Sequence, residues 1–558
     1  MTDIRPLLAI LVSAIAIPLI LALRSRPNLR EGVTLVAAVT KFAIVASLVP
    51  GVLAGETYRL ELGTFAPGVE FALRADALGV LFASLASLLW IVTSLYSIGY
   101  MRGLDEHAQT RYFASFAGSL SAVMGIAFAE NLLTLFVFYE LLTVATYPLV
   151  THDETDEARA AGRKYLAYTF GGGVAVLGGT AIVFWLTGTA TFTPGGIDGL
   201  TGADPLWART AFVLLAAGFG VKAALMPIHS WLPDAMVAPT PVSGLLHAVA
   251  VVKSGVFGIA RVVLDVYGTD GLAEIGMALP LAAVAAFTLL TASVIALRQD
   301  NLKRRLAYST VSQLSYIVLG LALLEGNALI GGLLHIPAHA FMKLTLFFAA
   351  GAIHVETHTD DISDMAGIGK RMPLTMAAFG VAAAGMAGIP LVAGFVSKWY
   401  LVIGALEGGS LVFALALLAS GVLNIAYFWP IVYQAYFESA DDHDEKPLLS
   451  GPLGGRFGTA YTDGGVPEVD DRRAQDGPSD AADTQPDPHT GDHNEHHGGP
   501  PEGGWDRRDW FGGESTWFML GPILATATGS LIIGIVPANA VFLRIVRTIV
   551  ENLPGVIV

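Results

Sequence analysis

The stretch ALIGGLLHIPAHAFMKLTLFFAAGAIH, residues 328–354, decides the fold of this chain. At about 1.5 Å per residue it is long enough to cross the roughly 30 Å hydrocarbon core of a bilayer as one α-helix. It also holds His335, His339 and Lys343, which are spaced four residues apart and therefore line one helix face. The apolar length predicts a membrane helix. The titratable face predicts a function at membrane depth, because ionisable groups are costly there.

Similar apolar stretches recur along the whole chain. The 558 residues are 54% hydrophobic and 14% charged, whereas soluble domains carry about 25% charged residues. We therefore predict an all-α polytopic membrane protein. Its fourteen predicted spans lie near 4–23, 33–54, 76–98, 112–129, 131–151, 164–187, 208–226, 241–263, 275–297, 306–324, 328–354, 374–404, 411–436 and 516–536. The first has no small-residue cleavage site, so we expect a retained helix and not a signal peptide.

Several classes of chemistry are excluded by composition. The chain has no cysteine, which excludes disulfides, thiolate zinc sites, iron–sulfur clusters and a thiol nucleophile. It also has no glycine-rich loop of the Walker or Rossmann type, so we expect it to bind neither ATP nor NADH. We expect no cofactor and no redox or hydrolytic chemistry in the chain.

The acidity of the chain is confined to one segment. Residues 438–515 hold 19 Asp/Glu and 6 Lys/Arg, which accounts for most of the net charge of −15. This Gly/Pro-rich segment lacks apolar surface to bury, so we predict that it is disordered. Its composition hints at a halophilic source, and it gives no reason to expect a nucleic-acid partner. The segment contains candidate ligands for a loosely bound metal, namely His489, His493, His496 and His497. A solvated polar tract is the favoured interpretation.

Basic residues set the predicted orientation. With the N-terminus outside the cell, the short inner loops hold 14 Lys/Arg and the outer loops and termini hold 5. The positive-inside rule selects this arrangement. We therefore predict a multi-pass plasma-membrane protein with both termini extracytoplasmic and residues 438–515 cytoplasmic.

Two predicted spans carry breaks at related places. One contains Gly218-Phe-Gly-Val-Lys222 followed by Pro227, and the other contains Gly388-Ile-Pro390 followed by Gly394-Phe-Val-Ser-Lys398. The pattern Gly-Phe-x-x-Lys thus recurs after 176 residues. Interrupted helices in two halves of a transporter favour an ion site at a repeat interface. The competing interpretation is that Gly and Pro are simply common in membrane helices.

Ionisable residues inside the predicted spans are the candidate functional groups. They are Glu140, Lys222, His247, Lys253, His335, His339, Lys343 and Lys398. A lysine in a low dielectric can cycle between amine and ammonium near neutrality, and a nearby carboxylate such as Glu140 would favour the ammonium of Lys222. Histidines and lysines along one helix face suit a proton relay.

Other interpretations of these residues are weaker. His335 and His339 have the spacing of a zinc pair, but no carboxylate or thiolate lies at helical spacing to complete the site, so we expect no metal there. Interhelical hydrogen bonding explains each histidine singly, yet an ammonium is a costly way to join helices. Lys41 is expected to snorkel and Arg261 to lie near an outer end, so both are left out of the relay. Glu130 is expected to cap a helix.

Long ordered motifs give the chain a family resemblance. They are Phe-Tyr-Glu140-Leu-Leu-Thr, Lys222-x-x-x-x-Pro227-x-His229-x-Trp231-Leu-Pro-Asp-Ala235, Pro239-Thr-Pro-Val-Ser243, Leu-His247, Lys253, Asp300-x-x-Lys303-Arg304-x-x-Ala-Tyr-Ser-Thr310 and His335-x-x-x-His339-Ala-x-x-Lys343. Over about residues 75–437 the chain resembles the antiporter-like subunits of respiratory complex I and the large subunits of Mrp-type Na+/H+ antiporters.

The resemblance implies both a fold and roles. It implies fourteen helices with both termini outside, and helices 4–8 and 9–13 related by inversion. Glu140 matches the essential glutamate of helix 5, Lys222 the lysine of broken helix 7, Lys253 that of helix 8, and Lys398 the ionisable residue of broken helix 12. The corresponding units would be 1–111, 112–264, 274–437, the acidic segment 438–515, and 516–558 with helix 14 and a C-terminal tail.

Within this family the Mrp D subunit is the favoured match, because complex I subunit M resembles the chain but has glutamate at the position of Lys398. Subunit N also carries lysine there and stays an alternative. We therefore expect an ion-translocating subunit of a multi-subunit Na+/proton antiporter, surrounded by other membrane subunits and lipid. The alternatives are a proton-pumping subunit of an NADH–quinone oxidoreductase or a membrane-bound hydrogenase, and a structural subunit without transport.

Overall fold

The computed structural model describes residues 1–66, 68–200, 202–439, 498–501, 504–507 and 513–557. Most of the acidic segment 438–515 lies outside the described residues. The predicted disorder of that segment, and any loose metal binding by His489, His493, His496 and His497, therefore remain sequence predictions.

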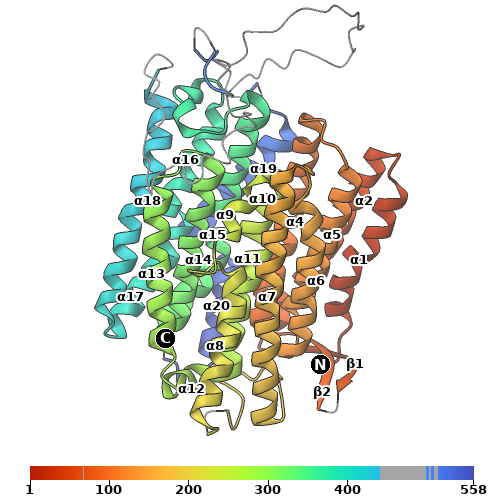
Figure 1. Cartoon of the computed structure of the whole chain (residues 1–558), viewed down its shortest axis with the longest axis vertical. Coiled ribbons are helices and arrows are strands. Elements are labelled where there is room, and N and C mark those ends of the chain that lie inside the picture. The colour runs from red at the N-terminus through yellow and green to blue at the C-terminus, as the bar shows by residue number, and fades with distance from the viewer. Residues whose placement is uncertain (67, 201, 440–497, 502–503, 508–512, 558) are drawn as a thin grey trace, which may run out of the picture.

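The described chain is a bundle of long helices that run along one axis (Figure 1). Each of the fourteen apolar stretches forms helix at the expected place. In the first half these are α1 (Arg5–Ala22), α2 (Pro27–Ala46) with α3 (Val49–Leu53), α4 (Ala77–Gly103), α5 (Gln109–Ala127), α6 (Leu132–Val150), α7 (Asp156–Thr187) and α8 (Pro205–Lys222). The eighth is α10 (Thr240–Gly244), the π-helical turn η2 (Leu245–Val249), α11 (Val251–Arg261) and the π-helical turn η3 (Val262–Tyr267).

The second half repeats this pattern of long and interrupted helices. Its spans are α13 (Ala278–Ala296), α14 (Leu302–Ala322), α15 (Gly326–Thr357), α16 (Pro373–Ala387) with α17 (Ala393–Glu407), α18 (Leu411–Phe437) and α19 (Trp517–Ile535). Short pieces join the long helices: α9 (Trp231–Asp234), η1 (Ala235–Val237), α12 (Gly268–Glu274), η4 (Ile362–Asp364) and η5 (Ile368–Lys370). Among the described residues, nine helical segments are by themselves long and apolar enough to cross a membrane. The other predicted spans are shorter, interrupted or more polar.

Both helix breaks predicted from glycine and proline are present. Helix α8 ends at Lys222, and the chain then turns through Ala224, which has a positive φ of 55°. Helix α16 ends at Gly388 with a φ of 91°, and α17 resumes at Ala393 after Pro390. Pro390 lacks an N–H and Gly388 tolerates the left-handed conformation, so the second break follows directly from its residues.

Two elements were not predicted from the sequence. Strands β1 (Tyr58–Ala66) and β2 (Val69–Ala75) form an antiparallel hairpin between α3 and α4. Helix α20 (Val541–Glu551) lies in the stretch expected to be a tail. It has apolar residues at helical spacing, and Ile545, Val546 and Val550 are buried. The hairpin adds two short strands to an otherwise helical membrane protein.

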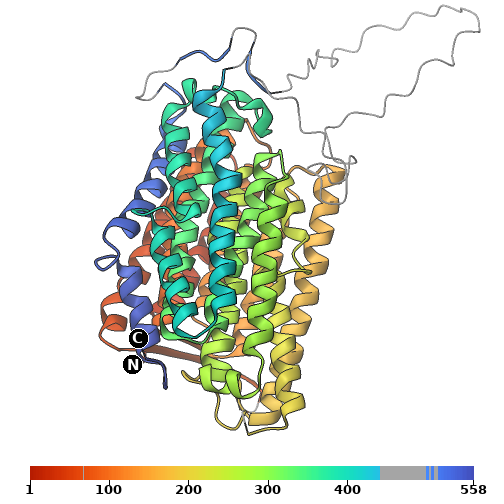
Figure 2. The same ribbon diagram turned by 90° about the vertical axis from the view of Figure 1, so that its left-hand side faces the viewer.

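The two ends of the described chain lie at the same end of the bundle (Figures 1 and 2). This placement agrees with an even number of membrane crossings. The extracytoplasmic placement of both termini stays a prediction.

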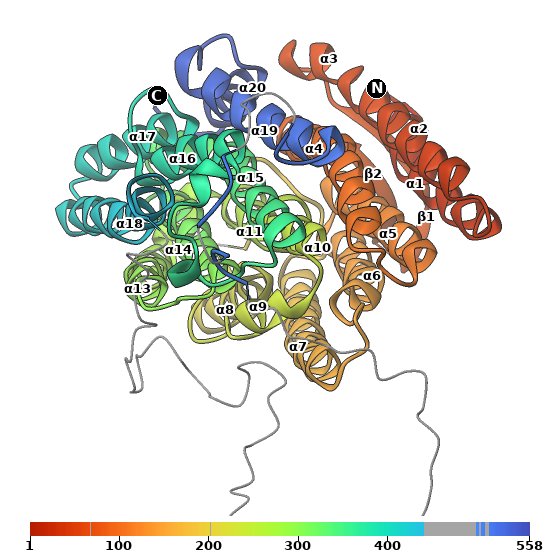
Figure 3. The ribbon, with the colours of Figure 1, turned by 90° about the horizontal axis from the view of Figure 1, so that it is seen from above.

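Helix α15, which contains residues 328–354, lies in the interior of the bundle. Viewed along the bundle axis in Figure 3, it is enclosed by other helices. It packs against α14, α16, α17 and α19 and also touches α10 of the first half. Every residue of its most apolar 18-residue window is buried. The helix with the three titratable residues is therefore shielded from lipid along its length.

Candidate functional site

The eight candidate residues lie on six helical segments that contact one another in sequence across the bundle, from α6 and α8 through α11 and η2 to α15 and α17. Glu140 is on α6, Lys222 ends α8, and His247 and Lys253 lie on η2 and α11. His335, His339 and Lys343 lie on α15, and Lys398 lies on α17. All but Glu140 are buried, with Lys398 the most exposed at 9%.

Lys222 is held by the residue that precedes Glu140. Its Nζ atom donates a hydrogen bond of 2.6 Å to the carbonyl of Tyr139 and lies 3.5 Å from the centroid of the Tyr139 ring. The carbonyl dipole and the ring face both stabilise an ammonium. The ammonium of Lys222 is thus stabilised by a carbonyl dipole and a ring face, without contact with a carboxylate.

Glu140 lies beside this lysine without forming an ion pair with it. Among the described residues, no ion pair within 4.0 Å joins Glu140 to Lys222. Both carboxylate oxygens of Glu140 are buried and accept no hydrogen bond there. A Cβ atom at Gly173 on α7 would lie 1.9 Å from Oε1, so the absence of a side chain at Gly173 makes the space for the carboxylate. The expected pair of Glu140 and Lys222 therefore lies close together without direct contact. Lys222 contacts Tyr139, the residue that precedes Glu140.

The centre of the site joins the two halves of the chain. Lys253 Nζ lies 2.7 Å from Nδ1 of His339, so α11 and α15 share a hydrogen bond between two titratable groups. The ring centroids of His339 and His335 are 6.1 Å apart. Nε2 of His339 is buried and has no hydrogen-bond partner among the described residues. An open nitrogen beside a chain of titratable groups is suited to accept a proton or a water molecule.

His335 is the most fully bonded histidine of the site. Its Nδ1 lies 2.8 Å from the Ser397 hydroxyl on α17, and its Nε2 lies 2.9 Å from Oε1 of Gln313 on α14. With the Gln313 amide in this orientation, Nε2 carries a proton, and the Ser397 hydroxyl that faces Nδ1 also donates to the Gly394 carbonyl at 3.2 Å. The Tyr316 ring stacks on His335 at 5.5 Å and also lies 4.6 Å from Lys398 Nζ. His335 therefore stands beside Lys398.

His247 has no hydrogen-bond partner among the described residues. Both of its ring nitrogens are buried, and its nearest aromatic neighbour is Phe347, at 5.0 Å between ring centroids. It lies on η2, where the wider π-helical turn interrupts the regular α-helical bonding. Unsatisfied polar atoms at this depth mark a place where water or a transferred proton can be accommodated.

A chain of hydrogen-bonding groups that sequence reasoning missed connects Lys343 to Lys398. Lys343 Nζ donates to the Ser309 hydroxyl at 2.9 Å, and the Tyr427 hydroxyl lies 3.1 Å from the same oxygen. The Tyr427 hydroxyl also contacts Oδ1 of Asn424, whose amide donates to the Met386 carbonyl at 3.1 Å. Lys398 Nζ donates to that same carbonyl at 2.5 Å. Neutral Ser, Tyr and Asn residues at helical spacing carry little sequence signal, which is why charge alone did not find them.

Comparisons with known proteins assign the fold and the family. The family model described as "NADH:quinone oxidoreductase/Mrp antiporter, TM" matches residues 129–424, slightly more than half of the chain. The chain is 33% identical over 453 residues to NADH-quinone oxidoreductase subunit N of Desulforudis audaxviator, covering 79% of this chain and 89% of that protein. The chain belongs to this family.

Other known proteins match the chain in sequence or in fold. The chain is 35% identical over 410 residues to a probable K(+)/H(+) antiporter protein of Rhizobium meliloti, of which it covers 39%. A chain from the Mrp complex of Dietzia sp. DQ12-45-1b has the same fold, with a TM-score of 0.76 at 23% identity over 98% of this chain and 97% of that one. A chain of an archaeal membrane-bound sulfane sulfur reductase also matches with a TM-score of 0.76, at 21% identity.

The region matched by the family model contains all eight candidate residues. Two further buried cations are left out of the relay: Lys41, which lies before the matched region, and Arg261, which lies within it. Lys41, on α2 before the matched region, is fully buried, so the expected snorkelling is wrong. Its Nζ donates to Ser13 at 2.5 Å and to the Leu120 carbonyl at 2.8 Å, and lies 4.8 Å from the Trp90 ring centroid. Four helices meet around this ammonium, which explains why it does not reach an interface.

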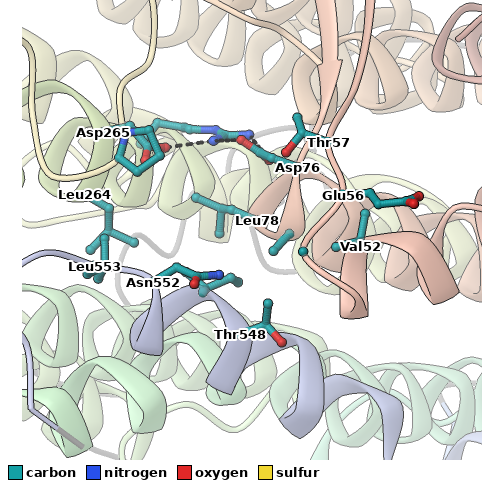
Figure 4. Close-up of a pocket in the computed structure, with 15 residues that line it drawn as sticks. Val52, Glu56, Thr57, Asp76, Leu78, Leu264, Asp265, Thr548, Asn552 and Leu553 are labelled. Atoms are coloured by element: carbon teal, nitrogen blue, oxygen red, sulfur yellow. Dashed lines mark hydrogen bonds and ion pairs between the residues drawn. The ribbon is translucent and has the colours of Figure 1, made fainter. Parts of the chain in front are cut away.

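Arg261 anchors a polar cluster at the end of the bundle where the termini lie. Its guanidinium pairs with Asp76 at 2.7 Å and with Asp265 at 2.7 Å (Figure 4). The three side chains border a cavity of about 130 Å³ that is also lined by Thr548 of α20 and by Asn552, which follows α20. Asp76 caps α4 by accepting from the Gly79 N–H at 2.8 Å. Arg261 therefore ties α4 to the eighth span and has a structural explanation outside the relay.

Glu130 also has a place outside the relay. It precedes Asn131, whose side chain caps α6, and its carboxylate pairs with Arg59 of the hairpin at 2.7 Å. The expectation that Glu130 itself caps a helix is wrong, because Asn131 fills that role.

Proposed function

We propose that the chain is an ion-translocating subunit of a multi-subunit monovalent cation/proton antiporter, and that it moves protons along its buried lysines, histidines and glutamate. The single observation that carries the proposal is the direct contact of Lys253 with His339 inside a bundle of membrane-spanning helices. Titratable groups at membrane depth cost free energy, so two of them in hydrogen-bonding contact there favour a function such as proton transfer.

The relay has three parts in this proposal. Lys222 receives or releases a proton beside Glu140, where the Tyr139 carbonyl and ring stabilise its ammonium. Lys253 and His339 pass the proton across the boundary between the two halves. Lys343 and Lys398 then exchange it through water molecules held between them by the side chains of Ser309, Tyr427 and Asn424, because an amide and a backbone carbonyl do not themselves pass on a proton.

The two lysines at helix breaks are the loading points in this scheme. Lys222 is the last residue of α8, and Lys398 reaches back across the break to the Met386 carbonyl on α16. At a break the backbone carbonyls are no longer used by the helix, so they can solvate an ammonium when it forms. The chain thus offers partial charges in place of a bulk-water shell.

The identity of the exchanged cation rests on the family. We propose Na+ and an Mrp D-type subunit because lysine occupies position 398, where complex I subunit M has glutamate. The Rhizobium relative carries the name of a K(+)/H(+) antiporter, and flux assays with Na+ and with K+ distinguish the two cations. Other membrane subunits would complete the assembly in the plasma membrane, with the termini extracytoplasmic.

A second candidate is supported by one specific observation. The subunit N relative is covered over 89% of its length, whereas the Rhizobium antiporter relative is covered over 39%. In that case the chain would be a proton-pumping subunit of an NADH–quinone oxidoreductase or a hydrogenase-type complex. The same relay would operate, and a redox reaction in other subunits would drive it.

The test compares Lys222→Ala with Lys370→Ala in vesicles that contain the whole complex. Lys370 is exposed and lies in the short loop helix η5, so it is a matched lysine outside the relay. We expect Lys222→Ala to abolish cation-driven proton movement at normal assembly, and Lys370→Ala to leave it unchanged. Wild-type exchange by a fully assembled Lys222→Ala complex would refute the relay. Exchange that requires NADH or another electron donor would favour the second candidate.

A further inference from the structure

Three potential metal ligands converge in loops that the relay does not use. Glu106 and His107 lie between α4 and α5, and His152 lies between α6 and α7. These loops are at the end of the bundle opposite the chain termini (Figure 1). Among the described residues, no other group of three or more His, Asp or Glu side chains has ligand atoms gathered closely enough to hold a metal.

The distances between the ligand atoms are close to those of a filled site. Glu106 Oε2 lies 3.7 Å from His152 Nε2 and 3.8 Å from His107 Nδ1, and all candidate ligand atoms are within 4.8 Å of one another. Around a tetrahedral Zn²⁺ with bonds of about 2.0–2.1 Å, neighbouring ligand atoms are roughly 3.3–3.4 Å apart. Small side-chain rotations of Glu106 and His107 would close the site.

His152 supplies independent evidence for a ligand. Its side chain is 0% exposed, and neither ring nitrogen has a hydrogen-bond partner among the described residues. A buried imidazole with both nitrogens unsatisfied costs free energy, and such a group calls for an explanation. A bound metal ion at Nε2 would provide one.

The surroundings fix His152 in place. The Arg111 guanidinium donates to the His152 carbonyl at 3.0 Å, and the His152 and Tyr112 rings make an edge-to-face contact at 5.8 Å between centroids. The positive charge of Arg111 is itself paired with Glu154. His152 is therefore rigid, while His107, with 51% of its side chain exposed, is free to adjust.

We propose that Glu106, His107 and His152 bind a transition-metal ion of the Zn²⁺ type, with water as the fourth ligand. Two imidazoles and one carboxylate suit Zn²⁺, whereas Mg²⁺ and Ca²⁺ prefer oxygen ligands throughout. The exposed side of His107 leaves the fourth position open to solvent. A bound ion clamps the α4–α5 loop to the α6–α7 loop and so restrains the end of α6, the helix that carries Glu140.

The test measures Zn²⁺ binding by the purified full-length chain without an affinity tag, by calorimetry and by competition with a chromophoric chelator. All samples carry His443→Ala, His489→Ala, His493→Ala, His496→Ala and His497→Ala, so that the acidic segment cannot supply histidine ligands. We expect one saturable site per chain with micromolar or tighter affinity. His107→Ala and Glu106→Gln should weaken it at least about tenfold, and His152→Ala should abolish it.

A matched control separates this site from ordinary histidine binding. His354 lies 3.0 Å from the Asp360 carboxylate near the same end of the bundle, so His354→Ala removes a comparable surface pair and should leave Zn²⁺ binding unchanged. Zinc-edge X-ray absorption should report two imidazole ligands. Binding only in the millimolar range, or a saturable site that persists in both His107→Ala and Glu106→Gln, would overturn the proposal. His107 is exposed, so its replacement tests the site even if His152→Ala fails to fold.

Discussion

Lys253 on α11 lies 2.7 Å from Nδ1 of His339 on α15, and this contact joins the first half of the chain to the second. Because α11 and α15 are far apart in the sequence, only the packed bundle brings the two groups together. Each residue is fully buried. In the proposed relay, this contact is where a proton passes between the halves.

The Lys253–His339 contact should act as one unit in transport. We expect Lys253→Ala and His339→Ala each to slow proton movement by about a hundredfold or more, and the double variant to be no slower than the single ones. The measurement is the initial rate of cation-driven proton movement in vesicles with normal assembly of the complex. Additive losses in the double variant would mean that the two residues serve separate routes.

We expect transport to require that Lys222 can release its proton, and not only that a positive charge is present at this position. Lys222→Arg keeps a cation beside the Tyr139 carbonyl, but a guanidinium does not release its proton in the accessible range. We therefore expect Lys222→Arg to be as inactive as Lys222→Ala. Flux assays across about pH 6–9 would check this, and substantial activity of the arginine variant would show that Lys222 acts only as a fixed charge.

The space beside Glu140 gives a test that leaves every titratable group in place. A methyl group at Gly173 would lie 1.9 Å from Glu140 Oε1, whereas one at Gly171, on the same helix, meets nothing within 4 Å. We expect Gly173→Ala to displace the carboxylate and impair exchange strongly, and Gly171→Ala to be nearly silent. Equal rates in the two variants, at equal assembly, would show that the position of Glu140 is unimportant.

The second half should tolerate change at Lys398 better than the first half does at Lys222. Lys398 has no carboxylate within 4.0 Å in the described part of the chain, and its Nζ contacts a carbonyl and an aromatic ring. We expect Lys398→Ala to impair exchange strongly and Lys398→Glu to retain part of it, because another titratable group remains. Tyr427→Phe should slow exchange as well, since it removes the hydroxyl between Ser309 and Asn424. Full activity of both Lys398→Ala and Tyr427→Phe would exclude this branch.

Arg261 should contribute to stability and not to the relay. Arg261→Ala leaves the buried Asp265 without its cation and Asp76 with Arg74 as its remaining partner, so we expect a loss of about 3 kcal/mol in the free energy of unfolding. Asp76→Asn should cost less, because Asp265 still pairs with Arg261. Unfolding by denaturant in detergent micelles would measure both. A neutral Arg261→Ala would show that this cluster does not stabilise the fold.

The helices and the titratable residues could be predicted because each leaves a strong local signal. About twenty apolar residues specify a span, and a lysine such as Lys253 stands out within one. Glycine and proline marked the break at Gly388 because they act on the backbone directly.

The remaining features depend on partners that are distant in sequence. Lys41 resembles a snorkelling residue until Ser13 and Leu120 are seen to surround it. The separation of Glu140 from Lys222 depends on packing against α7, which spacing does not reveal. The hairpin 58–75 alternates polar and apolar residues, a pattern typical of strands that is easily overlooked in a chain composed mainly of membrane helices.

The placement of four lysines and one glutamate in the interior limits how many protons the core can hold at once. If Glu140, Lys222, Lys253, Lys343 and Lys398 were all ionised, the core would hold a net charge of +3. Because the positive charges repel one another, each added proton binds more weakly than the one before. A negative charge placed beside Glu140, such as a carboxylate of an adjoining protein, would therefore raise the number of protons that the core holds. It would do so without direct contact with any of the lysines.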